Sequence, residues 1–575
     1  MNVPVWTHAA RLAAQAPPER NRYVDFLRAA SICLVILGHW LLVAPYTQDG
    51  QLVYGDLLTL VPWVRWLTWL FQVMPIFFLV GGYVNGLGWH AAQRRQESYA
   101  SWLAHRLQRL ILPVLPVLVA WTLISLAWVL LDPDPVHLKI ISQVAIVPVW
   151  FLVVYTLIVL LVPLAHRAWQ RYKLASFWAL VAAAALLDLL ALGAGWRLLG
   201  WLNYLVVYLA IHQLGFAWQS DRIGGPRRCL LWAAGGLAAL IALVNFGPYP
   251  FSMVTVQGEE ISNNMPPNLT MLALGAAQTG LLLALEKPAR RLLERGALWT
   301  TTALINGIIM TIFLWHFTAL MLVSGLALLT GVGLSFIPGT DAWWLTRPLW
   351  TAVLALTLVP FVAAFTRFER NGPSPRRAAP PAWQLLLGCA LVSFGLVPLT
   401  LHGIPTENWP GINLIALALP FIGAALVCFN PPRTRKSANE ESPWQNPTDR
   451  KVYNATQTDA LKIERGTGNI FADLGLPNAE THLLKAQLAT RIEKTIRQRQ
   501  LKQPEAAALL GLSQPALTRL LRGNFREHSV EHLLSLLTAL GRDVEIVIHE
   551  PTPHEEGETD GLSTTQLKGK LTIAA

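Results

Sequence analysis

Long apolar segments separated by short polar loops fill the first three quarters of the chain. A helix that crosses a bilayer needs about 20 mostly apolar residues, and the pattern therefore predicts about twelve transmembrane helices. Their expected ranges are 26–46, 64–88, 109–131, 141–164, 175–194, 200–218, 228–246, 268–286, 303–330, 343–366, 382–403 and 410–430.

The loops between these segments alternate in charge. Arginine and lysine gather in every second loop, as at 94–109 and 167–173, while the loops between them are richer in acids, as at 49–56 and 132–134. Because basic loops face the cytoplasm, we expect a multi-pass protein of the cell (inner, cytoplasmic) membrane with both termini cytoplasmic. The lipid bilayer is then its first partner.

The composition agrees with a membrane protein. Of the 575 residues, 53% are hydrophobic and only 14% are charged, whereas soluble proteins carry about a quarter charged residues. The four cysteines lack the spacing of a disulfide framework or a metal site, and no P-loop, GxSxG or HExxH motif is present. The sequence therefore indicates no metal and no permanently bound cofactor. Basic cytoplasmic loops explain the net charge of +11.

The first apolar segment contains two ionisable side chains, Arg28 and His39, eleven positions apart. Eleven residues make about three helical turns, so both lie on one helix face, roughly 16 Å apart along the axis. Asp25 lies three residues before Arg28 and shares that face. Ionisable groups inside a membrane-spanning helix are costly and are by default functional. The alternative is an arginine that reaches the interface and a histidine bonded to a neighbouring helix.

These residue types suit acyl transfer to a hydroxyl, which needs a base and a site that holds the donor. Histidine is the side chain most easily poised near neutral pH, so His39 is the candidate base. Arg28 can bind a phosphate or carboxylate of the donor, with Asp25 orienting it. Arg106 and Arg109 lie three apart near the cytoplasmic end of a span, where they can clamp a polyphosphate or simply anchor the helix.

Four stretches resemble motifs of the membrane-bound acyltransferase-3 family. They are Tyr23 to His39, Pro75 to Tyr83, His105 to Pro113 and Val149 to Leu152, in family order and at family-like separations. The resemblance covers residues 20–370. It implies an all-α core of ten helices that transfers an acyl group, usually acetyl, from cytoplasmic acyl-CoA to a sugar or other envelope hydroxyl. It also implies that His39 is catalytic and that Arg28, Arg106 and Arg109 hold the phosphates of this donor substrate.

Three further residues are candidates for substrate contacts. Gly81 and Gly82 end the second motif, and His316 lies in a later segment that is similar to a histidine-containing stretch of the family. Helix packing would also explain the glycines, and a hydrogen bond between helices would also explain His316. Two helices after residue 370 and a soluble domain are departures from the family's ten-helix core.

Residues 461–550 have the pattern of a small soluble domain. Apolar spacing predicts helices over 484–499, 503–510, 514–523 and 530–540, then a short strand over 544–548. Helix, glycine-containing turn and helix is the DNA-binding arrangement whose second helix enters the major groove. The segment resembles the phage-repressor-like helix-turn-helix family, in particular antitoxin-type regulators.

By that resemblance DNA is a candidate partner, with a protein–protein module as the alternative because acids and bases nearly balance across the domain. The residues expected to face bases, backbone or phosphates are Ser513, Gln514, Thr518, Arg519 and Arg522.

The expected organisation combines these parts. It consists of a cytoplasmic tail (1–24), a membrane acyltransferase domain (25–370), two additional transmembrane helices (371–430), a linker (431–460), the helix-turn-helix domain (461–550) and a disordered tail (551–575). The leading hypothesis is an integral membrane acyltransferase. A membrane-tethered transcription regulator, or a fusion of an acyltransferase with an independent antitoxin-like regulator, is the alternative.

Overall fold

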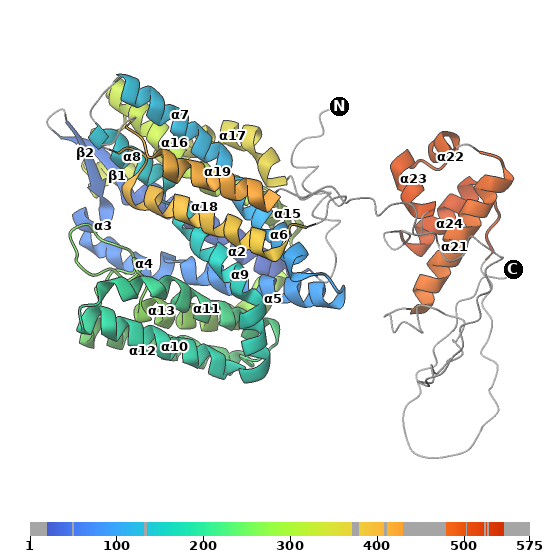
Figure 1. Ribbon diagram of the computed structural model, residues 1–575, viewed down its shortest axis with the longest axis horizontal. Helices are drawn as coiled ribbons and strands as arrows, with labels where there is room; N and C mark the ends of the chain where they lie inside the picture. The colour runs from blue at the N-terminus through green and yellow to red at the C-terminus, as the bar shows by residue number, and fades with distance from the viewer. Residues whose placement is uncertain are drawn as a thin grey trace, which may run out of the picture. The chain divides into compact units, whose positions relative to one another are not determined.

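The computed structural model describes residues 20–48, 51–131, 135–370, 379–406, 411–428, 479–501, 503–521, 525 and 528–545. The chain forms two compact units, Met1–Glu441 and Ser442–Ala575. The first is a bundle of long apolar helices and the second is a small helical unit (Figure 1).

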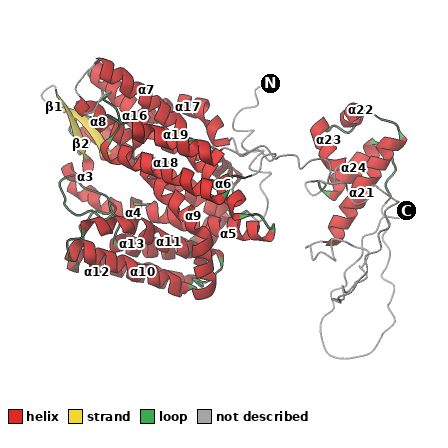
Figure 2. Cartoon of the chain, in the orientation of Figure 1, coloured by secondary structure: helices red, strands yellow, loops and turns green. Residues whose placement is uncertain are grey.

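The described part of the first unit is helical apart from one two-stranded sheet (Figure 2). It contains ten helical segments that are long and apolar enough to cross a membrane, or 11 if the bent pair α13/α14 is one span. The unit is therefore a helical polytopic membrane protein, as the apolar pattern predicts. The helices are α2 (Arg22–Leu42), α3 (Leu57–Leu60), α4 (Leu67–Phe71), α5 (Met74–Arg94), α6 (Tyr99–Ile111), α7 (Val114–Leu131), α8 (Pro135–Ile146), α9 (Val149–Tyr172), α10 (Leu174–Asp188), α11 (Asn203–Gln219), α12 (Pro226–Phe246), α13 (Leu269–Ala284), α14 (Glu286–Leu292), α15 (Gly296–Asn306), α16 (Ile309–Thr330), α17 (Asp341–Arg370), α18 (Ala382–His402) and α19 (Leu414–Cys428), with 3₁₀ turns at Pro62–Trp66 and Arg197–Leu202 and a π turn at Leu189–Gly193.

The predicted spans 303–330 and 410–430 differ from the structure. The segment 303–330 is not one helix, because α15 ends at Asn306 and α16 starts at Ile309, with Gly307 between them. The expected last span, 410–430, is the 15-residue helix α19, which is shorter than the length that crosses a bilayer unaided. It packs on α18 where Gly388 and Gly423 bring the two backbones into contact.

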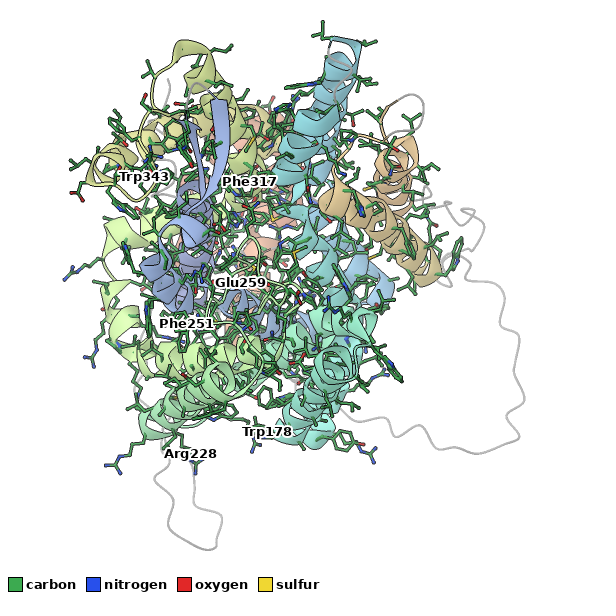
Figure 3. The ribbon with its side chains drawn as sticks, turned by 90° about the vertical axis from the view of Figure 1, so that its left-hand side faces the viewer. Trp178, Arg228, Phe251, Glu259, Phe317 and Trp343 are labelled. Carbon is green, nitrogen blue, oxygen red and sulfur yellow. The ribbon has the colours of Figure 1, made fainter. Side chains whose placement is uncertain are left out.

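Helix α2 ends earlier than predicted and leads into a hairpin. β1 (Val43–Gln48) pairs antiparallel with β2 (Gln51–Asp56), with Val43 opposite Asp56. Pro45 cannot continue a helix, which explains why the predicted span 26–46 ends at Leu42. Ala44 packs in a small core with Leu57 and Trp343, at the end of the unit that faces the viewer in Figure 3.

Helix α2 lies against α5, α15 and α16, so it is surrounded by other helices of the bundle. The Asn21 side chain caps its first turn by accepting hydrogen bonds from the backbone N–H groups of Tyr23 and Val24. Helix α5 approaches α11 closely, since a Cβ at Gly82 or Gly215 would collide with the backbone of the other helix. In Figure 1, α10, α12 and α13 lie together in one half of the bundle and α18 and α19 in the other.

The second unit confirms the four predicted soluble helices. They are α21 (Ala479–Gln498), α22 (Gln503–Leu509), α23 (Gln514–Leu521) and α24 (Val530–Ala539). Leu488, Ile492, Leu517 and Leu533 are among the residues of their shared core. Val544 and Glu545 do not form the expected strand, and the rest of that stretch lies outside the described residues, as do the predicted linker and C-terminal tail.

Candidate active site

His39 and His316 form a hydrogen-bonded pair within the membrane unit. His39 Nδ1 lies 2.9 Å from His316 Nε2, and the two rings are nearly parallel at 13°. His316 Nδ1 lies 2.5 Å from the backbone oxygen of Phe313. The helix-bridging bond that sequence reasoning weighed for His316 is therefore present, and its partner is the candidate base.

These contacts assign the tautomers of both histidines. A carbonyl oxygen only accepts, so His316 carries its proton on Nδ1 and its Nε2 is an acceptor. His39 must then donate from Nδ1, which leaves a lone pair on its Nε2. The hydrogen bonds from the Phe313 carbonyl through His316 to His39 thus leave His39 Nε2 able to accept a proton.

The surroundings hold the pair in place. The His39 ring stacks on Phe317, with ring centroids 4.8 Å apart, and the Trp40 indole donates a 3.0 Å hydrogen bond to the His316 carbonyl. His316 is fully buried, whereas His39 remains partly exposed. His39 is therefore the member of the pair that a substrate can reach.

The N-terminus of α16 is fixed by a carboxylate from α17. Glu369 accepts hydrogen bonds from the backbone N–H groups of Met310 and Thr311 and from the Thr311 hydroxyl, at 2.9–3.2 Å. An acid at a helix N-terminus is favoured by the helix dipole and by the unpaired N–H groups there. Because His316 lies on α16, this contact helps to set its depth in the bundle.

Arg28 contacts the same interrupted pair of helices as His39, at the break between α15 and α16. Its Nε donates a 2.6 Å hydrogen bond to Asn306 Oδ1, and Asn306 Nδ2 donates to the Asp25 carbonyl at 2.8 Å. Arg28 and His39 thus lie on one helix face, as their spacing predicts. Asn306 is a site residue that sequence reasoning missed, and its signal was a lone amide in an apolar segment beside Gly307.

The Asp25 carboxylate is shared by two arginines. Arg20 donates to it from Nε at 2.5 Å and from Nη2 at 3.2 Å, while Arg28 Nη2 lies 3.8 Å from Oδ1. The hydrogen-bonded carboxylate raises the pKa of Arg20. Asp25 therefore contacts Arg28 as expected, but Asn306 makes the shorter and direct bond that orients it.

Part of the Arg106 guanidinium is not hydrogen-bonded among the described residues. Its charge packs over the Trp102 ring, 4.5 Å from the centroid, and a Cβ at Gly88 of α5 would collide with it. Its Nε is buried and has no hydrogen-bond partner among the residues that the structure describes. Arg106 interacts electrostatically with Arg109, which also interacts with Arg28. The structure thus brings the three predicted cations into one electrostatic neighbourhood.

Tyr155 is a second residue that sequence reasoning missed. Its hydroxyl accepts a 3.3 Å hydrogen bond from Asn85, which also contacts His212, and it interacts electrostatically with both Arg28 and Arg106. Among the described residues it donates no hydrogen bond, so its proton is available to a ligand. It lies four residues after Phe151 of the fourth motif, one helical turn further along.

The two glycines proposed as substrate contacts, Gly81 and Gly82, pack against neighbouring helices. Gly82 leaves no room for a ligand, because the His212 carbonyl lies against its Cα. Gly81 faces the Tyr155 ring at a distance that a side chain would disturb. These contacts allow the close approach of α5 to α9 and α11, which is the packing role that the sequence offered beside substrate contact.

In the soluble unit, the residues predicted to contact DNA lie on helix α23 and the turn before it. Ser513, Gln514 and Arg519 are exposed and Thr518 is partly exposed, while Leu517 and Leu520 are buried on the opposite face. Gly511 has a positive φ of 64° in the turn between α22 and α23, where glycine is favoured. Arg522 lies outside the described residues.

This fold and site define a polytopic membrane protein with a hydrogen-bonded histidine pair that joins α2 to α16 and with arginines grouped near one end of α2. Comparison with known families matches residues 21–367 to the acyltransferase domain of the acyltransferase-3 type and residues 470–549 to a helix-turn-helix domain. The first match covers well over half of the chain, so the protein belongs to the acyltransferase-3 family and is an acyltransferase fused to a helix-turn-helix domain. No curated protein and no solved structure matches the chain.

The tautomers of the histidine pair can be tested by nuclear magnetic resonance of the full-length protein with ¹⁵N-labelled histidine. The variants His39→Gln and His316→Gln identify the signal of each ring by its disappearance. At neutral pH we expect both signals to be those of neutral rings protonated on Nδ1, because each Nδ1 has an acceptor. Removing the exposed His137 should leave those signals unchanged. A ring of His39 protonated on Nε2 would contradict the assignment.

Proposed function

We propose that the membrane unit transfers an acyl group, most simply acetyl, from cytoplasmic acyl-CoA to a hydroxyl of an envelope carbohydrate or similar acceptor. The observation that carries this proposal is the bond from His39 to His316, because it leaves a lone pair on His39 Nε2. A partly exposed neutral imidazole with a fixed tautomer is what general-base catalysis of hydroxyl attack requires. In this arrangement the Arg28 end of α2 faces the cytoplasm.

The reaction steps follow from the chemistry of the pair. His39 Nε2 takes the proton of the acceptor hydroxyl while the oxygen attacks the thioester carbonyl. The resulting imidazolium keeps donating from Nδ1 to neutral His316, which stabilises the new charge. When the tetrahedral intermediate collapses, the carbon–sulfur bond breaks and the proton on Nε2 passes to the departing thiolate. The products are an acylated acceptor and a free thiol, and His39 regains its lone pair.

The donor is held at the Arg28 end of α2. Acyl-CoA carries several phosphates, and Arg28, Arg106 and Arg109 supply positive charge within one neighbourhood. The unpaired Arg106 Nε and the Tyr155 hydroxyl supply two further donors. Arg28 lies roughly 16 Å from His39 along the helix axis. A donor whose phosphates bind at the arginines therefore has to extend its thioester arm into the bundle.

Replacement of the two histidines tests the base and its partner separately. His39→Ala is expected to lower kcat by about 10²–10⁴-fold, the usual contribution of a general base. His316→Phe should lower kcat less, and His316→Gln should recover part of the loss because its amide oxygen can accept from His39 Nδ1. The measurements are thiol release by the purified protein and mass spectrometry of envelope glycans from cells that express each variant.

The matched control for these variants is His137→Gln, which removes an exposed histidine and should leave activity unchanged. Each variant is compared at equal amounts of folded protein in the membrane. Full acylation by His39→Ala would end the assignment of this residue as the base.

The donor site can be tested with two donors that share an acetyl thioester. Arg106→Gln is expected to raise KM for acetyl-CoA by about 10–100-fold, since hydrogen bonds to charged groups are worth about 1.5–3 kcal/mol. KM for acetyl-pantetheine, which lacks the nucleotide phosphates, should change little. Arg94→Gln removes an exposed cation from the end of α5 and is the matched control. An equal effect of Arg106→Gln on both donors would show that Arg106 does not bind the phosphates.

We propose as a second function that the soluble unit binds DNA through α23. The observation that favours it is the division of α23 into a buried apolar face and an exposed polar face that carries Gln514 and Arg519. Ser513, Thr518 and Arg522 are assigned to the same surface from the sequence. DNA binding by this unit fits a membrane-bound regulator, and it also fits an enzyme that is fused to an independent regulator.

The DNA-binding proposal is tested by selecting preferred sequences from a pool of random duplexes with the full-length protein. Arg519→Ala is expected to weaken binding to the selected site at least tenfold and, if it contacts a phosphate, to reduce the salt slope by about 1. Arg491→Ala removes the same charge from an exposed position on α21 and should bind like the wild type. Failure to enrich any sequence would contradict the proposal.

A further inference from the structure

A buried arginine of α17 has no carboxylate partner among the described residues. Arg347 is only 6% exposed. Its Nε donates to the Trp343 carbonyl at 3.3 Å and its Nη2 to the Thr346 hydroxyl at 3.2 Å. The guanidinium carbon lies 4.4 Å from the Trp343 ring centroid and 5.2 Å from that of Trp350. None of the ion pairs between described residues includes Arg347.

The environment of Arg347 favours an anionic ligand. A buried charge is costly unless an opposite charge and hydrogen bonds compensate it. The two indole rings and two neutral oxygens supply part of that compensation, but they leave the net positive charge in place. A guanidinium matches a phosphate because it can donate two parallel hydrogen bonds.

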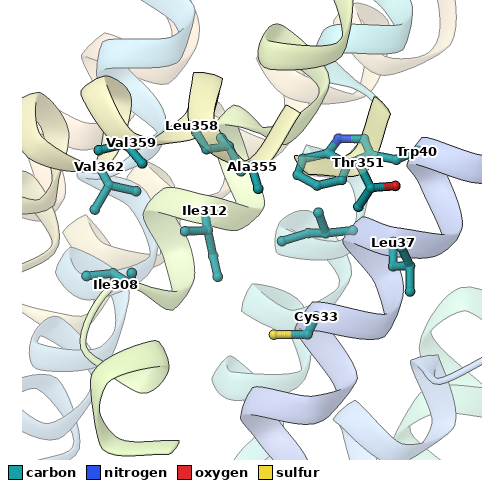
Figure 4. Close-up of a pocket in the computed structure, with 11 residues that line it drawn as sticks. Cys33, Leu37, Trp40, Ile308, Ile312, Thr351, Ala355, Leu358, Val359 and Val362 are labelled. Atoms are coloured by element: carbon teal, nitrogen blue, oxygen red, sulfur yellow. The ribbon is translucent and has the colours of Figure 1, made fainter. Parts of the chain in front are cut away.

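An apolar groove begins one helical turn further along α17. Thr351, Ala355 and Val362 of α17 form one wall, and Leu37 and Trp40 of α2 are part of the other (Figure 4). The cavity volume is about 410 Å³, and the stretch of α17 from Thr351 to Val362 extends over about 16 Å. Apart from the Thr351 hydroxyl and the Cys33 thiol, the lining side chains are hydrocarbon or aromatic. The groove therefore suits a hydrocarbon chain.

The groove and Arg347 lie in line along α17. Thr351 follows Arg347 by four residues, so the two residues share one helix face with their backbones about 6 Å apart along the axis. The guanidinium extends from there towards Trp343. Glu369, near the other end of α17, binds the start of α16. That end of α17 is also the end near Asn306, the partner of Arg28. Arg347 consequently lies towards the end of α2 that carries His39.

The groove also contacts the histidine pair through one residue. Trp40, which lines it, donates its indole hydrogen bond to the His316 carbonyl. Leu37 and Trp40 flank His39 in the sequence of α2. The same turn of α2 therefore forms a wall of the groove and carries the candidate base.

We propose that this part of the protein binds an anionic amphiphile, with one hydrocarbon chain in the groove and a phosphate at Arg347. The groove is built from membrane-spanning helices, so a lipid chain reaches it from the surrounding bilayer. Trp343 and Trp350 beside Arg347 suit the depth at which lipid head groups meet hydrocarbon. The identity of the acceptor follows from this site, and this step rests on the proposed acyl transfer. The acceptor is a hydroxyl compound that is anchored to a lipid.

The test uses three probes and the full-length protein, without any acyl donor. Native mass spectrometry measures how much dioleoylphosphatidate, dioleoylglycerol or glycerol phosphate the purified protein retains. The wild type is expected to retain the phosphatidate at least tenfold better than either of the others, because only the phosphatidate supplies both chain and phosphate. Equal retention of glycerol phosphate would show that the groove contributes nothing and would overturn the proposal.

Two variants separate the head-group contact from the chain contact. Arg347→Gln should reduce retention of the phosphatidate about tenfold, to the level of dioleoylglycerol, and Arg347→Lys should keep part of the preference. Ala355→Trp fills the groove and should reduce retention of both lipids. Ala352→Trp adds the same side chain to an exposed position of α17 that is not part of the groove, and it should bind like the wild type.

The outcomes are independent of catalysis. Wild-type retention of phosphatidate by both Arg347→Gln and Ala355→Trp would overturn the ligand site, whatever the activity of the enzyme. If the lipid is retained as expected but His39→Ala still transfers acyl groups, the binding site stands and the proposed reaction fails.

Discussion

The arrangement of the membrane unit depends on the need of polar groups to find partners where no water is available. Helix α2 carries the Arg28 guanidinium and the His39 imidazole on either side of a mostly apolar stretch, and each would be costly if it faced hydrocarbon alone. Both find their partners on one neighbouring segment, Asn306 at the end of α15 and His316 in α16. These two bonds fix the rotation and the depth of α2 within the bundle.

A neutral histidine at position 316 has a chemical advantage over a carboxylate. A buried carboxylate beside His39 would add a permanent charge, which a membrane-embedded site can hold only with further compensation. The chain from the Phe313 carbonyl through His316 orients His39 without such a charge. A charge arises only when His39 takes a proton, and the existing hydrogen bond then becomes stronger. The pair thus stabilises the protonated intermediate through a bond that is already formed in the neutral resting state.

Local patterns predict most of the helices and part of the site, because helical periodicity is a property of neighbouring residues. The shared face of Arg28 and His39 follows from their spacing alone. The partner of His39 is 277 positions away in the chain, and the partner of Arg28 is 278 positions away. No local pattern encodes such a pairing. For the same reason Asn306 and Tyr155 were missed, although each is a polar residue in an apolar segment.

The two ends of α2 offer different chemistry, and this difference bears on how two unlike substrates can meet. At one end are Arg28 and its cationic neighbours, which suit a soluble and highly charged donor. A buried arginine lies towards the other end, and an apolar groove extends beside α2 from Cys33 to Trp40; together they suit an amphiphile. His39 lies on a turn of α2 that also lines the groove, and it is partly exposed. A base in that position can serve both substrates without a binding site that both must occupy, so neither substrate has to displace the other before the reaction.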